Sequence, residues 1–174
     1  MKKMLGALLL VAGFGLAQAP VHAADKLTDP QIAHVAYTAG VIDIGAAQLA
    51  LKTSKNKEVI DFANNMVADH TAVNDQALAL VKKLGVTPED NDVSKSLVSG
   101  SAAEQAKLAK LTGADFDKAY VANELAYHTA VDAALKDTLI PSASNAELKA
   151  LLTQGLQIFE GHRQHAQMLV DTIK

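Results

Sequence analysis

The chain has 174 residues, no cysteine and a formal net charge of −3 at pH 7. Without cysteine it forms neither disulfides nor thiolate metal sites, and a mildly acidic chain of mixed charge is not expected to bind nucleic acid or an anionic membrane surface. About 150 residues remain once a leader is set aside, which is enough for one domain held together by packing.

The first 23 residues have the pattern of a cleavable signal peptide. Lys2 and Lys3 precede an apolar run over residues 4–16, which is too short to span a bilayer comfortably, and Val21-His22-Ala23 is typical of a cleavage site. Cleavage there leaves a domain of residues 24–174 with 14 basic and 19 acidic residues and no transmembrane anchor. We therefore expect an exported protein, located most simply in a bacterial periplasm.

Two long amphipathic helices are predicted next. Thr28 and Pro30 mark the start of the first, which ends at a polar turn over residues 53–57, and Ser54 is a candidate N-cap for the second. A turn this short makes the two helices antiparallel. The second helix carries one stripe at steps of four and three, formed by Val59, Ala63, Met66, His70, Val73, Ala77, Leu80 and Leu84.

Residues 87–111 are predicted to form a weakly patterned helical crossover on the outside of a bundle. A third long helix begins near Asp115 and ends at Pro141, and a capping box at residues 144–147 opens the fourth. No segment alternates at period two, so strands are not expected. The pattern predicts an all-α fold, a ferritin-like four-helix bundle with a helical crossover between the second and third long helices.

Imidazoles interrupt three of the apolar stripes. His70 lies in the stripe of the second helix, His128 in that of the third and His162 in that of the fourth. Glu124 is one turn before His128 on the same face. Counting from the turn between the last two helices places Glu124 and His162 within roughly 3 Å of the same level. Buried imidazoles and a carboxylate are therefore expected near the middle of the bundle.

The first helix contributes a further carboxylate. Asp43 lies about 70° from the centre of that helix's stripe, so its side chain could lean inward. Counting from the first turn places His70 level with Tyr37, about one and a half turns from Asp43. Asp69 and His165 flank the stripes and could orient an imidazole from outside.

Imidazole and carboxylate groups from facing helices suit a transition metal ion such as Cu, Fe, Zn or Mn. The predicted ligands are His70, Glu124, His128 and His162, with Asp43 as a fifth group. The two Glu-x-x-His motifs of a di-iron bundle are missing, because the residues three before the histidines are Val67, Leu125, Phe159 and His162. The ligand set therefore favours a mononuclear site, or copper in preference to iron.

Several functions remain open at this stage. The first is metal binding with a handling or stress-related role. The second is a structural or interaction module of the cell envelope, in which a metal-free His/Glu network fixes helix packing. A small-ligand pocket and a metal-dependent redox enzyme are further alternatives. The sequence shows no Ser-His-Asp set, phosphate-binding glycine loop or catalytic carboxylate pair, so no catalytic residue, protein partner or oligomeric state is predicted.

Three segments carry a resemblance to a known family. They are the Phe62-Ala-Asn-Asn-Met-Val-Ala-Asp-His70 run, the Phe116–Tyr120 segment followed by His128, and His162 with Ala166 and Leu169 after it. The chain resembles a bacterial family catalogued as a domain of unknown function, of the DUF4142 type, over nearly the whole mature length. The resemblance implies a secreted or envelope-located helical domain grouped with the ferritin-like folds, and it implies no established activity.

Overall fold

The computed structural model describes residues 26–173, so the predicted signal peptide, residues 1–23, lies outside the described residues. Throughout residues 26–173 the regular structure is helical and no strand occurs. The helical elements are α1 (Asp29–Thr53), α2 (Lys57–Leu84), α3 (Asp92–Leu108), α4 (Gly113–Ala134), η1 (Leu135–Leu139), α5 (Ile140–Ser142) and α6 (Ala146–Thr172). The predicted all-α class is confirmed, while a ferritin-like relationship stays a prediction.

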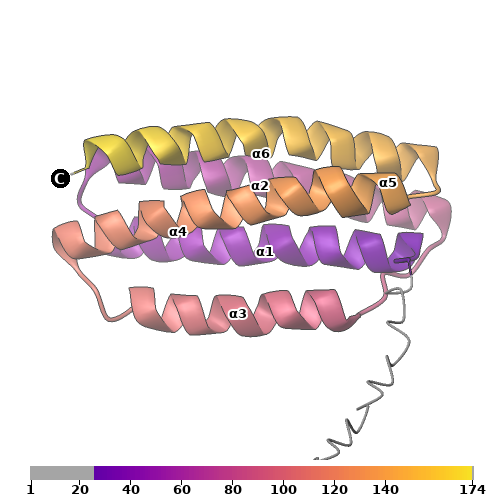
Figure 1. Cartoon of the computed structure of the whole chain (residues 1–174), viewed down its shortest axis with the longest axis horizontal. Coiled ribbons are helices and arrows are strands. Elements are labelled where there is room, and N and C mark those ends of the chain that lie inside the picture. The colour runs from indigo at the N-terminus through magenta and orange to yellow at the C-terminus, as the bar shows by residue number, and fades with distance from the viewer. Residues whose placement is uncertain (1–25, 174) are drawn as a thin grey trace, which may run out of the picture.

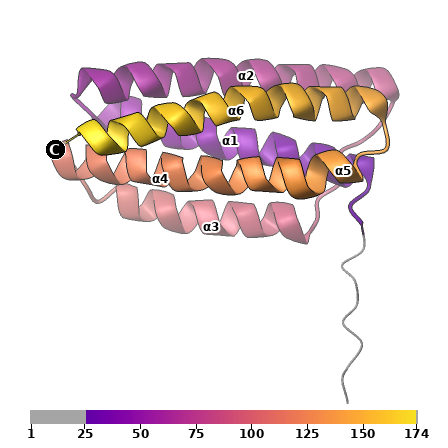
Figure 2. The same cartoon turned by 45° about the horizontal axis from the view of Figure 1, so that its top comes forward.

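Four long helices form the bundle, and α3 lies outside it. The antiparallel pair α1 and α2 packs against the pair α4 and α6, mainly through α2 and α6 (Figure 1). α3 runs back along the length of the bundle and packs chiefly on α1, so that α2 and α4 point the same way (Figure 2). The predicted crossover between the second and third long helices is therefore present, on the outside.

The helix ends differ from prediction in detail. Thr28 caps α1 in a capping box, as expected, but Asn56 rather than Ser54 caps α2, because its side chain accepts a hydrogen bond from the Glu58 amide. The third long helix does not end at Pro141 directly. It widens into the π-helical segment η1 and closes with the short α5, which contains Pro141.

Helix α1 is long and apolar enough, by length and composition alone, to cross a membrane, with a mean hydropathy of 1.2 in one 18-residue stretch. In the structure it is a bundle helix that packs on α2 and α3. Its buried face includes the carboxylate of Asp43. A core helix of a bundle is expected to be this apolar.

A polar layer divides the core into two apolar clusters. One cluster gathers the α1–α2 turn and the adjoining ends of α4 and α6, and includes Phe62, Met66 and Tyr120. The other lies toward the α1 N-terminus and includes Ile32 and Leu152. Between the two clusters every long helix buries at least one titratable side chain, and these are Asp43, His70, Glu124, His128 and His162.

The stripe predicted for α2 is only partly buried. Val59, Ala63 and Met66 are fully enclosed, whereas Val73, Ala77 and the residues after them are not. The second half of α2 therefore does not pack as closely as its periodicity suggested. Val73 and Ala77 instead line a cavity.

Ser54, although not a cap of α2, ties two distant parts of the chain together. Its hydroxyl donates a hydrogen bond to Asp117 Oδ1 at 2.5 Å, and both side chains are buried. Replacing Ser54 by alanine should lower the free energy of unfolding by about 1–3 kcal/mol, because Asp117 would lose its buried partner. Urea unfolding followed by circular dichroism measures this. The matched change Ser99→Ala, at an exposed serine that bonds only within α3, should have little effect; equal losses in both variants would contradict the assignment.

Candidate metal centre

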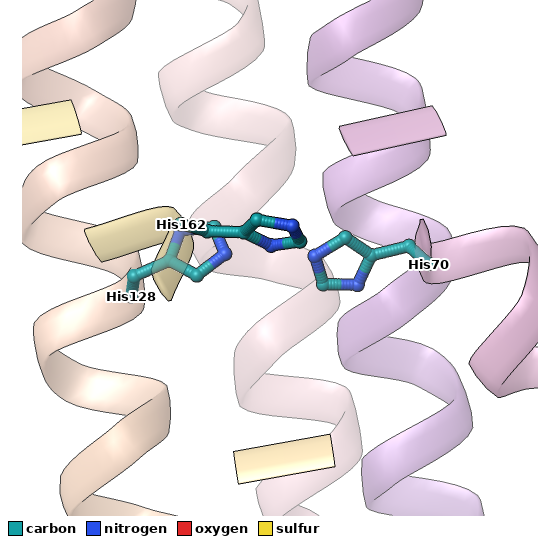
Figure 3. A group of neighbouring side chains, drawn as sticks. All are labelled: His70, His128 and His162. Carbon is teal, nitrogen blue, oxygen red and sulfur yellow. The ribbon is translucent and has the colours of Figure 1, made fainter. Parts of the chain in front are cut away.

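All four long helices bring buried polar side chains into one layer. α1 contributes Asp43, α2 His70, α4 Glu124 and His128, and α6 His162. Each is at most 7% exposed. Figure 3 shows the three imidazoles pointing toward one another from three different helices. The structure thus brings together every residue that the sequence proposed as a ligand.

Asp43 lies at the centre of the layer. Its Oδ2 is 2.8 Å from His70 Nε2 and 3.2 Å from His128 Nε2. The His70 contact lowers the pKa of the Asp43 carboxyl as a hydrogen bond would, although the ring N–H is not well aimed at the oxygen. The counting from the first turn was wrong here, since it placed His70 well away from Asp43. Side chains on a helix lean toward its N-terminus, which carries the His70 ring toward the level of Asp43.

Hydrogen bonds fix which nitrogen of two histidines carries the proton. His128 Nδ1 lies 3.0 Å from the Glu124 main-chain oxygen, which can only accept, so Nδ1 is the donor. The remaining nitrogen of neutral His128, Nε2, then presents its lone pair to the Asp43 carboxylate. Two lone pairs 3.2 Å apart repel each other unless a cation or a proton lies with them.

His162 is held in the same manner from outside the layer. Its Nε2 donates to Asp69 Oδ2 at 2.8 Å, which leaves Nδ1 with an unshared lone pair. Asp69 thus takes the orienting position that the sequence suggested for it. His165, the other candidate for that position, lies edge-on against Phe62 at 5.0 Å between ring centroids. No hydrogen bond joins His165 to the layer in the described part of the chain.

The layer as a whole is rich in acceptors and poor in donors. Buried atoms without a hydrogen-bond partner among the described residues are Asp43 Oδ1 and Oδ2, His70 Nδ1 and Nε2, Glu124 Oε2, His128 Nε2 and His162 Nδ1. Buried polar atoms are nearly always satisfied, and each exception requires a physical reason. A cation held by these groups would satisfy several of these exceptions at once.

The pKa values of the two carboxyl groups are shifted in opposite directions. Burial acts to raise the pKa of Asp43, but the adjacent imidazoles of His70 and His128 outweigh it and lower this pKa overall, so the group is ionised. Burial raises the pKa of Glu124 well above its usual range, and the negative charge of Asp43 adds to the effect. Two ionised carboxylates cannot share this space without a positive charge.

The imidazoles are suited to be ligands. Burial lowers the pKa of His128 to about 4, despite the opposing charge of Asp43, and burial likewise lowers the pKa of His162. Both rings are therefore neutral at pH 7, which is the form that binds metal ions. One ligand atom from each of His70, His128 and His162 lies within 4.8 Å of the others, and the same holds for Asp43, Glu124 and His128.

Small molecules and ions have a way to reach the layer. A cleft of about 280 Å³ between α1, α3 and α4 is lined by Asp43 and Glu124 at its inner end. Gly100 and Ser101 of α3 lie along the same cleft, and Gly100 is exposed. Two of the five polar groups therefore border a space that opens toward solvent.

Two aromatic residues, Phe159 and Tyr120, belong to the surroundings of the site. Phe159 stacks on the His70 ring, with centroids 4.5 Å apart and planes within 6°. Tyr120 has a buried hydroxyl without a partner, and burial together with the charges of Glu124 and Asp43 raises its pKa, so it stays protonated. Phe159 shares the stripe of His162, but no pattern in the sequence distinguishes it from an ordinary core aromatic.

Comparison with known protein families identifies the family of the chain. The family described as Domain of unknown function (DUF4142) matches residues 16–169, and the chain belongs to that family. No curated protein and no solved structure matches it. The family carries no activity in its description, so function has to be argued from the polar layer itself.

The lowered pKa of His128 predicts an acid-sensitive fold in the metal-free protein. The unfolded chain takes up this proton near pH 6.5 and the folded chain only near pH 4. The contribution of neutral His128 to the free energy of unfolding is therefore fully present above pH 6.5 and is lost as the pH falls toward 4. This contribution is about 3 kcal/mol at most. Urea titrations at pH 7 and pH 4.5 should show a smaller loss in His128→Leu than in the wild type. An equal loss in both would contradict the assigned protonation.

Proposed function

We propose that this protein binds one divalent transition metal ion in its core, through Asp43, His70, Glu124, His128 and His162. The observation that carries the proposal is the convergence of three imidazoles and two carboxyl groups from four helices, several of whose buried atoms have no hydrogen-bond partner among the described residues. Three imidazoles and two carboxylates supply nitrogen and oxygen ligands, and the carboxylates carry the charge that balances a divalent cation.

The ligand chemistry narrows the class of metal. Imidazole and carboxylate together suit Zn, Cu, Fe or Mn, and three imidazoles disfavour the hard ions Mg and Ca, which prefer oxygen. A pair of irons bridged by carboxylates would need more of them than Asp43 and Glu124. The proposal is therefore a single ion.

The proposed role is metal handling after export. The leader-like residues 1–23 support delivery across the inner membrane, and the acidic mature chain gives no support to a nucleic-acid partner. Binding of a metal ion, rather than turnover of a substrate, is the activity assigned here.

One alternative has an observation of its own. The hydrogen bond between His162 and Asp69, together with the close approach of Asp43 to two imidazoles, would also fix helix register without a metal. In that case the protein would be a structural module of the cell envelope. The two functions differ in whether the protein takes up an ion, which is measurable.

Metal content decides between them. Untagged protein dialysed separately against Zn²⁺, Cu²⁺, Fe²⁺ and Mn²⁺ should retain about one ion of at least one metal per chain, with a melting temperature that rises as the free metal concentration rises. His70→Ala should weaken binding more than about 100-fold, since loss of even an outer-shell partner costs about 10–100-fold. His34→Ala is the matched control, because His34 lies near Asp90 and away from the layer. Absence of stoichiometric uptake, or equal affinity in both variants, would refute the proposal.

Glu124→Gln should have opposite effects with and without metal. In the metal-free protein the raised pKa keeps folded Glu124 neutral while the unfolded side chain ionises above pH 4.5, so wild-type stability is lost as the pH rises. Glutamine does not titrate, and the variant should gain up to about 1.4 kcal/mol per pH unit relative to the wild type until Glu124 ionises.

With metal present the same substitution removes a carboxylate ligand, so metal affinity should fall. Chemical unfolding between pH 5 and 8 and metal titration measure the two effects. Glu89→Gln, at an exposed glutamate, serves as the control and should change neither. A metal-free Glu124→Gln protein that is less stable than the wild type at pH 8 would contradict the assigned protonation state.

A further inference from the structure

A second space in the bundle is independent of the cleft that reaches the metal centre. It is a cavity of about 450 Å³ on the α1 N-terminal side of the polar layer, with walls from α1, α2, α3, α4, η1 and α6. Its volume is within the usual range of small-molecule sites, roughly 300–1,000 Å³. It accounts for the partial burial of Val73 and Ala77, which border this space, although Val73 also packs against the second apolar cluster.

The chemistry of the walls is almost entirely aliphatic. Leucine, valine and alanine provide most of the lining, and none of the described residues that line the cavity is charged. Water inside such an aliphatic cavity finds few hydrogen-bond partners, so its presence there is unfavourable. An apolar molecule in the cavity would remove that cost.

One polar side chain, that of Asn74, interrupts the aliphatic wall of the cavity. Asn74 lines it and is only 7% exposed, with its amide packed against Gly40 of α1. The amide has both donors and an acceptor, so a hydroxyl or carbonyl of a molecule in the cavity could hydrogen-bond to it. The cavity lining has two other polar side chains. The Tyr127 hydroxyl already donates to the Ala39 carbonyl oxygen at 2.9 Å, and Thr138 is exposed to solvent.

The cavity opens to solvent beside α3. Val93 of α3 is 44% exposed, and Ala130 and Ala134 of α4 are exposed at the same wall. At the other end, Phe159 forms part of the wall while its ring stacks on His70. A molecule entering between α3 and α4 would therefore extend toward the metal centre and be separated from it by one aromatic ring.

We propose that this cavity is a binding site for a neutral, largely aliphatic small molecule with one hydrogen-bonding group, which contacts Asn74. The absence of charged groups from the described lining selects against carboxylates and amines of the same length, because their charge would be desolvated without a partner. The site does not depend on metal binding, so the two proposals can fail separately.

Fluorescence of the neutral probe N-phenyl-1-naphthylamine tests the site in metal-free protein. We expect saturable binding of about one probe per chain, and displacement by 1-decanol at least about tenfold more effective than displacement by decanoate at pH 8. Ordinary adsorption to the surface would not be saturable at this ratio. Absence of saturable binding, or equal displacement by the alcohol and the carboxylate, would overturn the proposal.

Two neighbouring alanines of α4 provide matched variants. Ala134 lines the cavity and Ala133 does not, although both are exposed, so both variants should fold. Ala134→Phe should lower probe affinity about tenfold by filling the space, and Ala133→Phe should leave it within about twofold. Asn74→Leu should keep probe binding and weaken decanol specifically. Equal probe affinity in the two phenylalanine variants would overturn the location of the site.

Discussion

The structure depends on the burial of an ionised carboxylate, Asp43, among imidazoles whose lone pairs also need a positive partner. The hydrogen bonds that would normally satisfy such groups are directed elsewhere, because His128 donates to its own helix and His162 to Asp69. Apolar clusters enclose the layer on either side. In that setting the proposed divalent cation would contribute charge, coordination and helix cross-linking at the same time.

Phe159 links the two sites that the bundle provides. One face of its ring stacks on His70, and the residue also belongs to the wall of the aliphatic cavity. The polar layer and the cavity therefore share a side chain without sharing a ligand class. A bundle with one hydrophilic and one lipophilic compartment stacked along its axis is a simple scaffold for binding two unlike molecules.

Much of the fold could be predicted because helical periodicity is a local property. The steps of three and four that place Met66 and His70 on one face are set by the chain itself, and the long connection before α4 leaves few topologies. Asp43 was recognisable as a residue near an apolar stripe. What periodicity cannot supply is the axial alignment of one helix pair on the other, which is decided by side-chain packing between α2 and α6.

The errors have the same physical origin. His70 was placed too far from Asp43 because counting residues gives the height of a Cα atom and not the reach or lean of a ring. Ser54 was assigned to a cap although its hydroxyl bonds to Asp117, 63 residues away. The stacked position of Phe159 and the cavity near Asn74 arise only when helices from both pairs meet, so no single segment encodes them.

Helix α3 borders both spaces but contributes no residue to the polar layer. Leu97 of this helix borders both the cleft that reaches Asp43 and the aliphatic cavity, whereas the residues that define the polar layer all belong to the four inner helices. Substitutions along α3 can thus alter which molecules enter either space, and how quickly, while the inner helices keep their register. In a family of such proteins, natural variation in this helix could change which molecules enter, at the least cost in folding stability.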